Sequence, residues 1–96
     1  MGNHDAGAIG AMDLGWFNDL AAWACRWTAN QLTQEVRQYL GSLPLTAAAA
    51  PFTLVHGTPQ DPLREYLVSE AQAIAAWNAV TTPVVLVGHL HRPFVC

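Results

Sequence analysis

Two short apolar segments with a helical stretch between them constrain the fold of this chain more than any other feature. Residues 51–56 (Pro-Phe-Thr-Leu-Val-His) and 83–88 (Pro-Val-Val-Leu-Val-Gly) are rich in β-branched residues, which is typical of buried strands. Residues 69–72 (Ser-Glu-Ala-Gln) resemble a capping box, which predicts that a helix begins there. A strand, a helix and a second strand form a βαβ unit, whose two strands are parallel and whose crossover is right-handed.

The first half of the chain has the periodicity of amphipathic helices. Large apolar side chains recur at spacings of four, three and four residues, at Trp16, Leu20, Trp23 and Trp27. This spacing places them on one face of a helix, and we expect these tryptophans and Trp77 to pack in the core. Thr33 is a candidate N-cap for a second helical segment, which Gly41 and Pro44 would end. The predicted fold class is α/β, with two N-terminal helices before the βαβ unit and a connector at residues 47–50.

All four histidines lie in three short motifs that contain glycine. His56 ends the first predicted strand and His89 follows the second, so parallel strands would bring both imidazoles to one edge of the sheet, where ligands of such sheets bind. If residues 88–91 are extended, His89 and His91 lie on one face about 6.6 Å apart. That spacing suits two metal ions about 3.5–4 Å from each other, with one imidazole on each ion. A solvent-facing His-x-His pair on an edge strand is the alternative.

Residues 2–5 (Gly-Asn-His-Asp) form the third motif. Neighbouring side chains on an extended segment point apart, so Asn3 and His4 are not expected to bind the same ion. One could hold a metal while the other reaches a substrate, and the glycine would allow a close backbone approach. Taken alone, the motif is more typical of a polar turn at a frayed terminus. A lone histidine at the end of a strand, such as His56, is likewise typical of a local hydrogen bond to a carbonyl.

Together and in this order, the three motifs resemble the last three motifs of the calcineurin-like metallophosphoesterases. The pattern of that family is Asp-x-His, Gly-Asp, Gly-Asn-His-(Asp/Glu), His-Gly and Gly-His-x-His. This chain has Gly-Asn-His-Asp at 2–5, His-Gly at 56–57 and Gly-His-Leu-His at 88–91. Residues 56–66 and 88–93 are also similar to the bacterial branch of small phosphodiesterase-like or diadenosine-tetraphosphatase-like enzymes. The resemblance implies a portion of the family's α/β sandwich, in which helices flank two sheets.

The resemblance also implies a set of metal ligands. Asn3, His56 and His89 would bind one ion, and His91 would bind the other. Imidazole and amide ligands suit Mn, Fe, Co, Ni or Zn. In the family, two such divalent ions hold the phosphate oxygens and lower the pKa of the water that attacks phosphorus.

Proton transfer would fall to other residues. By the same resemblance, His4 would be the acid that protonates the leaving group or contacts the phosphate, and Asp5 would orient it. Asp61, Arg64 and Arg92 could contact phosphate, although such residues are more often solvated or paired locally.

The first two motifs of the family, Asp-x-His and Gly-Asp, do not occur in these 96 residues. In the family, Asp-x-His supplies ligands of the first metal ion and Gly-Asp supplies the bridging carboxylate. We therefore expect residues 1–96 to be a partial domain whose N-terminal and C-terminal parts are missing. Such a chain should be an inactive piece of a hydrolase that binds at most one divalent ion, weakly. The alternative is a non-catalytic remnant or binding module that retains a partial single-metal site.

Composition excludes several other classes of protein. The net charge of −3 and the 11% of charged residues provide no basic field for nucleic acid or an anionic membrane. No leader or spanning segment is visible, and Cys25 and Cys96 have no disulfide or metal spacing, which favours a cytoplasmic setting. The hydrophobic content of 52% predicts apolar faces that need a partner. The motifs favour a phosphate-ester small molecule or a phosphoprotein as substrate, and they do not select between the two.

Overall fold

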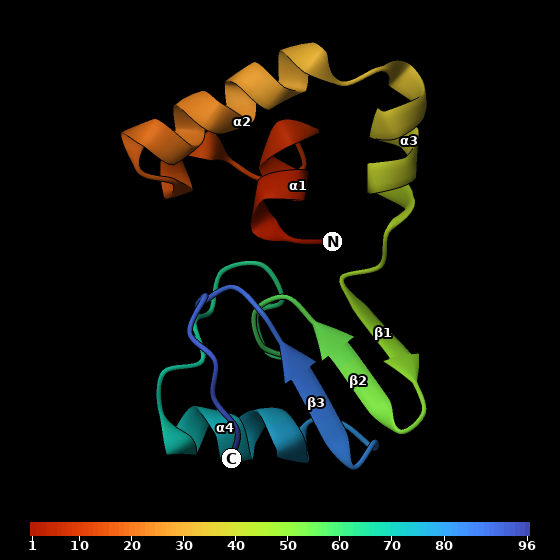
Figure 1. The fold of residues 1–96 in the computed structure, drawn as a ribbon, viewed down its shortest axis with the longest axis vertical. Coiled ribbons are helices and arrows are strands. Elements are labelled where there is room, and N and C mark those ends of the chain that lie inside the picture. Colours follow the sequence, from red (N-terminus) through yellow and green to blue (C-terminus); the bar gives the residue numbers. More distant parts are fainter. The chain divides into compact units, whose positions relative to one another are not determined.

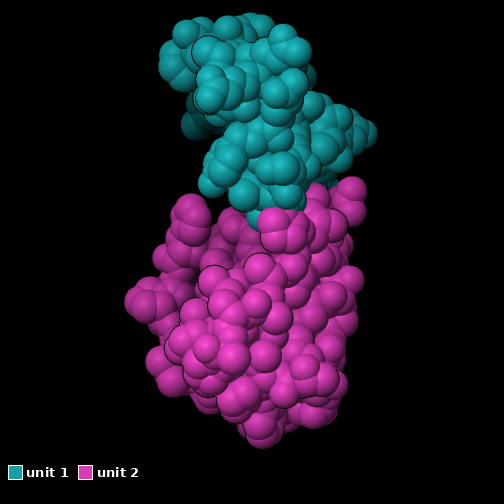
Figure 2. Space-filling view, turned by 90° about the vertical axis from the view of Figure 1, so that its right-hand side faces the viewer, with its two compact units in different colours: residues 1, 3–43 teal, residues 2, 44–96 magenta.

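The computed structural model describes residues 1–96, which form two compact units. Met1 and residues 3–43 make up the first unit, and Gly2 with residues 44–96 makes up the second (Figure 2). The first unit is helical, whereas the second contains a three-stranded sheet and one helix (Figure 1). The chain is therefore α/β, as its sequence predicts.

The first unit consists of helices only, in the order α1 (Asn3–Ala8), the 3-10 helix η1 (Leu14–Trp16), α2 (Asp19–Gln31) and α3 (Gln34–Ser42). The side-chain oxygen of Asn18 accepts a hydrogen bond from the backbone N–H of Ala21 and caps α2. Thr33 caps α3 in the same way through the N–H of Val36, which confirms the predicted cap. Both caps satisfy donors that the first turn of a helix leaves unpaired.

Residues 3–5 are helical, and this corrects the prediction of an extended segment. They form the first turn of α1, where successive side chains are rotated by about 100° around the helix axis. The side chains of Asn3 and His4 therefore still point in different directions. The cause is the rotation between successive residues of a helix and not the alternation of a strand.

The tryptophans lie on the exposed side of α2, and this corrects the prediction that they pack in the core. The buried residues of α2 are Ala22 and Cys25, whereas Trp23 and Trp27 are 60% and 56% exposed. The two remaining tryptophans, Trp16 in η1 and Trp77 in the second unit, are also exposed. Periodicity identified an apolar face of the helix, but the small side chains on another face are the ones that pack within the unit.

Close packing between α1 and α2 explains this choice of face. A Cβ atom at Gly7 would lie 3.0 Å from Sγ of Cys25 and 3.2 Å from the ring of Phe17. Contacts at these distances leave no room for a side chain, so the two helices approach through small residues.

The second unit contains the predicted βαβ arrangement. Its elements are β1 (Thr46–Ala49), β2 (Phe52–Val55), α4 (Glu70–Asn78) and β3 (Val84–Val87). The strand order is β1-β2-β3, and β2 runs parallel to β3 with Val55 opposite Val87 (Figure 1). Ser69 caps α4 by accepting from the N–H of Gln72 at 3.2 Å, as the capping-box pattern indicates. The two parallel strands therefore end at the same edge of the sheet.

The alanine run at residues 47–50 is mostly strand, which corrects its interpretation as a connector. Residues 46–49 form β1 and pair antiparallel with β2, Ala49 lying opposite Phe52. Alanine has a weak intrinsic preference for strands, so the ladder of hydrogen bonds to β2 decides its conformation here.

One face of the sheet is apolar and exposed. Phe52 and Leu54 on β2 are exposed, whereas Thr53 and Val55 on the other face are buried. The exposed face agrees with the high hydrophobic content of the chain. None of the helices combines the length and apolar character that crossing a membrane requires.

Candidate functional site

Two of the predicted metal ligands meet at the carboxyl edge of the parallel strands. His56 directly follows β2, and His89 lies two residues after β3. Nε2 of His56 is 3.1 Å from Nδ1 of His89, and the N–H of Gly88 donates to the carbonyl of His56 at 2.9 Å. The prediction that topology brings these two imidazoles together is confirmed.

The segment around His89 is a turn, and this corrects the prediction of an extended His-x-His pair. β3 ends at Val87, and the backbone φ angles of His89 and His91 are 62° and 55°. The N–H of Leu90 donates to the carbonyl of Gly88 at 2.7 Å, so a local turn replaces the strand ladder. A residue other than glycine in this left-handed region costs about 1–3 kcal/mol, and such residues cluster at functional sites.

The His89 ring is held by contacts on its face and on its edge. Tyr66 stacks on it with ring centroids 3.8 Å apart and an interplanar angle of 10°. Nε2 of His89 is 3.2 Å from the carbonyl oxygen of Arg64. A carbonyl only accepts hydrogen bonds, so Nε2 carries the proton and the lone pair of a neutral His89 is on Nδ1, facing His56.

The loop between His56 and Tyr66 is tied to α4 by a carboxylate. The hydroxyl of the fully buried Thr58 donates to one oxygen of Glu65, and the amide of Gln72 donates to the other at 3.1 Å. The N–H of Asp61 also donates to the Thr58 hydroxyl at 3.2 Å. Sequence reasoning missed Thr58, Glu65 and Tyr66 as contributors, although all three lie in the segment 56–66 that carries the resemblance.

Asp61 has a local structural role. Its Oδ1 accepts hydrogen bonds from the backbone N–H groups of Leu63 and Arg64 at 3.3 and 3.1 Å, which is the geometry of a side chain that stabilises a turn. This favours the local interpretation of Asp61 over contact with phosphate. Arg64 and Arg92 are exposed, and their contact with phosphate stays a prediction.

Asn3, His4 and Asp5 belong to the helical unit. Asn3 is buried and His4 is exposed. The His4 ring packs edge-on against Phe17 at 5.2 Å, and its Nδ1 is 3.7 Å from Sγ of Cys25. Cys25 and Phe17 are therefore contacts of His4 that the sequence did not suggest, while the orienting role of Asp5 stays a prediction.

Cys25 is expected to be alkylated by iodoacetamide at least about tenfold more slowly than Cys96, because the thiolate is the reactive form. Cys25 is buried and burial raises the pKa of its thiol, whereas Cys96 is exposed and serves as the internal control. Mass spectrometry of the alkylated peptides at pH 8 measures both rates. Equal rates in the folded chain would contradict the packing of α1 on α2.

Comparisons with known proteins identify the fold. The crystal structure of a metallophosphoesterase from Sphaerobacter thermophilus superimposes with a TM-score of 0.76 and 42% sequence identity, over 94% of this chain and 37% of that chain. This similarity confirms the predicted resemblance to the calcineurin-like metallophosphoesterases, for the part of that chain that is matched. Its helices and three-stranded sheet match a portion of that fold.

A sequence comparison likewise matches nearly the whole chain to part of a longer protein. An uncharacterized protein of Methanocaldococcus jannaschii is 32% identical over 101 residues, which cover 99% of this chain and 40% of that protein. The chain thus spans about two fifths of the length of both similar proteins. No family model matches the chain.

The geometry of the histidine pair fits two ligands of one metal ion. Two nitrogen ligands about 2.1 Å from an ion, at angles of about 90–110°, lie about 3.0–3.4 Å apart, and the two histidine nitrogens are 3.1 Å apart. The hydrogen bond from the second ring nitrogen of His89 to a carbonyl is typical of ligating histidines. Across residues 1–96, no group of three or more His, Cys, Asp or Glu side chains is arranged to hold a metal. The second unit therefore offers two nitrogen donors, and His91 does not complete the set.

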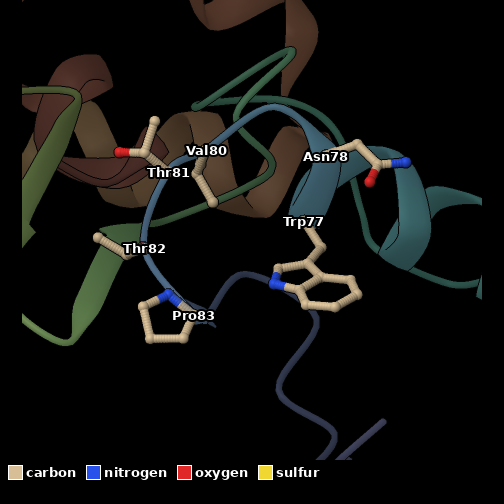
Figure 3. A pocket seen from close by; sticks show the side chains of 6 residues that line it. All are labelled: Trp77, Asn78, Val80, Thr81, Thr82 and Pro83. Atoms are coloured by element: carbon tan, nitrogen blue, oxygen red, sulfur yellow. The ribbon is translucent and has the colours of Figure 1, made fainter.

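A separate depression lies at the C-terminal end of α4 (Figure 3). Its lining consists of consecutive or nearly consecutive residues, Trp77, Asn78, Val80, Thr81, Thr82 and Pro83. These residues precede β3, whereas His89 follows it. The depression therefore lies at the amino edge of the parallel strands, away from the histidine pair.

Proposed function

We propose that this chain supplies part of the metal centre of a metal-dependent phosphoesterase that hydrolyses phosphate monoesters or diesters. The observation that carries the proposal is the approach of His56 Nε2 to His89 Nδ1 at 3.1 Å, in a chain that is 42% identical to a metallophosphoesterase. When bound, divalent ions supply positive charge to the phosphate oxygens and lower the pKa of the attacking water.

The proposed ligands divide into two sets. Asn3, His56 and His89 hold one ion and His91 holds the other, and Mn, Fe, Co, Ni and Zn all suit these donors. Support comes from the lone pair of His89 Nδ1, which faces Nε2 of His56. His56 and His89 leave the remaining positions of that ion to donors elsewhere, which are proposed to be Asn3 and the Gly-Asp carboxylate of the family pattern.

His4 is proposed to give a proton to the leaving group or to contact the phosphate. Its ring is exposed, while Phe17 and Cys25 contact it. An exposed imidazole with a restrained ring is suited to proton donation, because its polar edge can reach a substrate oxygen without reorganisation. Asp5 is proposed to orient it.

The proposed substrate is a phosphate-ester small molecule or a phosphoprotein. The similarity of residues 56–66 and 88–93 to the small phosphodiesterase-like and diadenosine-tetraphosphatase-like branch supports a small phosphodiester as the substrate. The proposed compartment is the cytoplasm, and manganese is a proposed metal. The alternative, a non-catalytic remnant or binding module, is favoured by the lack of a three-residue metal cluster within residues 1–96.

The isolated chain is expected to bind at most about one Mn²⁺ or Zn²⁺ ion, weakly, because a site without a bridging carboxylate lacks charge compensation. It should hydrolyse bis-p-nitrophenyl phosphate no faster than buffer. Calorimetry measures the stoichiometry, and absorbance of nitrophenolate measures the hydrolysis. Tight binding of two ions by the isolated chain would contradict this expectation.

A chimeric protein would distinguish the proposal that this chain is part of an enzyme from the alternative that it is a non-catalytic remnant. In it, this segment replaces the matching 37% of the Sphaerobacter metallophosphoesterase chain. If the proposed function is correct, the chimera should bind metal, and it should hydrolyse any diester that the unmodified Sphaerobacter protein hydrolyses. A folded chimera that binds metal poorly and has no activity would favour the remnant.

A further inference from the structure

We propose that Tyr66, together with the backbone carbonyl of Arg64, is a positioning device that holds the imidazole of His89 in the orientation and tautomer that metal binding requires. The proposal rests on the proposed function, because it gives His89 the role of a metal ligand. It adds a residue that neither the motif pattern nor the family resemblance assigned.

The stacking contact fixes the plane of the His89 ring. The two rings are nearly parallel, at 10°, and their centroids are 3.8 Å apart, which is a full face-to-face overlap at van der Waals distance. His89 is 8% exposed whereas Tyr66 is 43% exposed. The tyrosine therefore lies on the solvent side of the pair and covers one face of the imidazole.

The carbonyl of Arg64 fixes the rotation of the ring within that plane. It accepts the N–H of His89 Nε2 at 3.2 Å, which leaves the Nδ1 lone pair directed at Nε2 of His56. A half-turn of the ring would exchange Nδ1 for a carbon atom and would break both contacts. Stacking and hydrogen bonding together therefore select one orientation and one tautomer, which is how partners behind a metal ligand raise affinity.

His89 needs such support because its backbone does not provide it. Its φ angle is 62° and β3 ends at Val87, so His89 lies outside the regular strand. Contacts with its ring come from His56 and from the segment 64–66.

That segment is itself anchored. Glu65 lies between Arg64 and Tyr66, and its two carboxylate oxygens accept hydrogen bonds from Thr58 and Gln72. Thr58 is fully buried, and Gln72 belongs to α4. Because both oxygens of the Glu65 carboxylate are held, the neighbouring residues Arg64 and Tyr66, which contact His89, are held in place as well.

The test is a Zn²⁺ titration of the 96-residue chain, followed by NMR through the ring signals of His56 and His89. Tyr66→Ala should raise the dissociation constant about 10–100-fold, the usual cost of losing a partner behind a metal ligand. Tyr66→Phe keeps the ring and should bind within about twofold of the wild type. Tyr39→Ala removes another exposed tyrosine, in α3, and is the matched control.

A second readout needs no metal. In the metal-free chain, Tyr66→Ala should remove the upfield ring-current shift of the His89 ring protons and turn a single Nε2–H tautomer into a mixture, whereas Tyr66→Phe should keep both signatures. A Tyr66→Ala chain that binds Zn²⁺ as tightly as the wild type would overturn the positioning role and leave the proposed function standing. A wild-type chain whose histidine signals do not respond to Zn²⁺ would overturn this inference, while the chimera tests the proposed function separately.

Discussion

Replacing His89 with alanine is expected to abolish measurable metal binding by this chain and to remove diester hydrolysis from the chimera with the Sphaerobacter enzyme. The second unit contributes two converging nitrogens, and removing one leaves His56 and Asn3 as the proposed ligands of that ion. One neutral imidazole and one neutral amide hold a divalent ion poorly, so affinity should fall by more than the roughly 10–100-fold that losing an outer partner costs. Metal content by mass spectrometry and nitrophenyl diester turnover, measured on the same samples, report both losses.

His4→Ala is the matched variant, because His4 is proposed to transfer a proton and not to ligate. It should retain nearly all of the metal and lose about 10²–10⁴-fold in turnover, the usual contribution of a general acid. If His4→Ala removes the metal as completely as His89→Ala does, the division of roles within residues 2–5 is wrong. Asn3 and His4 would then exchange roles.

Gly57→Ala is expected to be the most destabilising small substitution in the second unit. A Cβ atom at this position would lie 2.6 Å from the carbonyl oxygen of Asp61 and 2.9 Å from that of Glu65. Both are backbone atoms of the loop that carries the contacts of His89, and the N–H of Gly57 also donates to the carbonyl of Pro62 at 2.8 Å. Forcing such overlap should cost about 3 kcal/mol or more of the free energy of unfolding.

Urea denaturation of the chain measures this loss, with Gly88→Ala as the control in the same unit. The nearest atom to a Cβ at Gly88 is Nδ1 of His56, at an ordinary 3.5 Å, so its cost should stay below about 1 kcal/mol. Because the displaced loop also carries Arg64 and Tyr66, Gly57→Ala should weaken Zn²⁺ binding as well. Equal stability of the two variants would contradict the tight loop.

The sequence by itself determined the βαβ unit and the meeting of His56 with His89. Both follow from local patterns: apolar β-branched segments, a capping signal at Ser69, and a right-handed crossover that makes consecutive strands parallel. Parallel strands end at one edge, so residues just after them must be neighbours whatever the surrounding packing. The order of the three histidine motifs also predicted the resemblance to metallophosphoesterases, which the 42% identical structure confirms.

Only the tertiary structure decided which surfaces pack and how the ligand segment bends. Small residues set the contact face of α2 because Gly7 lets α1 approach Cys25 closely, while the larger and more regular tryptophan face stays exposed. Pairing with β2 turned an alanine run into β1. Each outcome depends on a partner distant in sequence, which periodicity does not specify.

The support of His89 is the clearest case of such dependence. Its left-handed backbone, the carbonyl of Arg64 and the stacked ring of Tyr66 come from segments about two dozen residues apart. The motif Gly-His-Leu-His predicts that His89 is a ligand, but the contacts that orient its ring come from the loop after β2. Side-chain orientation is set by three-dimensional packing, and for that reason the sequence identified the histidine while the fold decided where its nitrogen points.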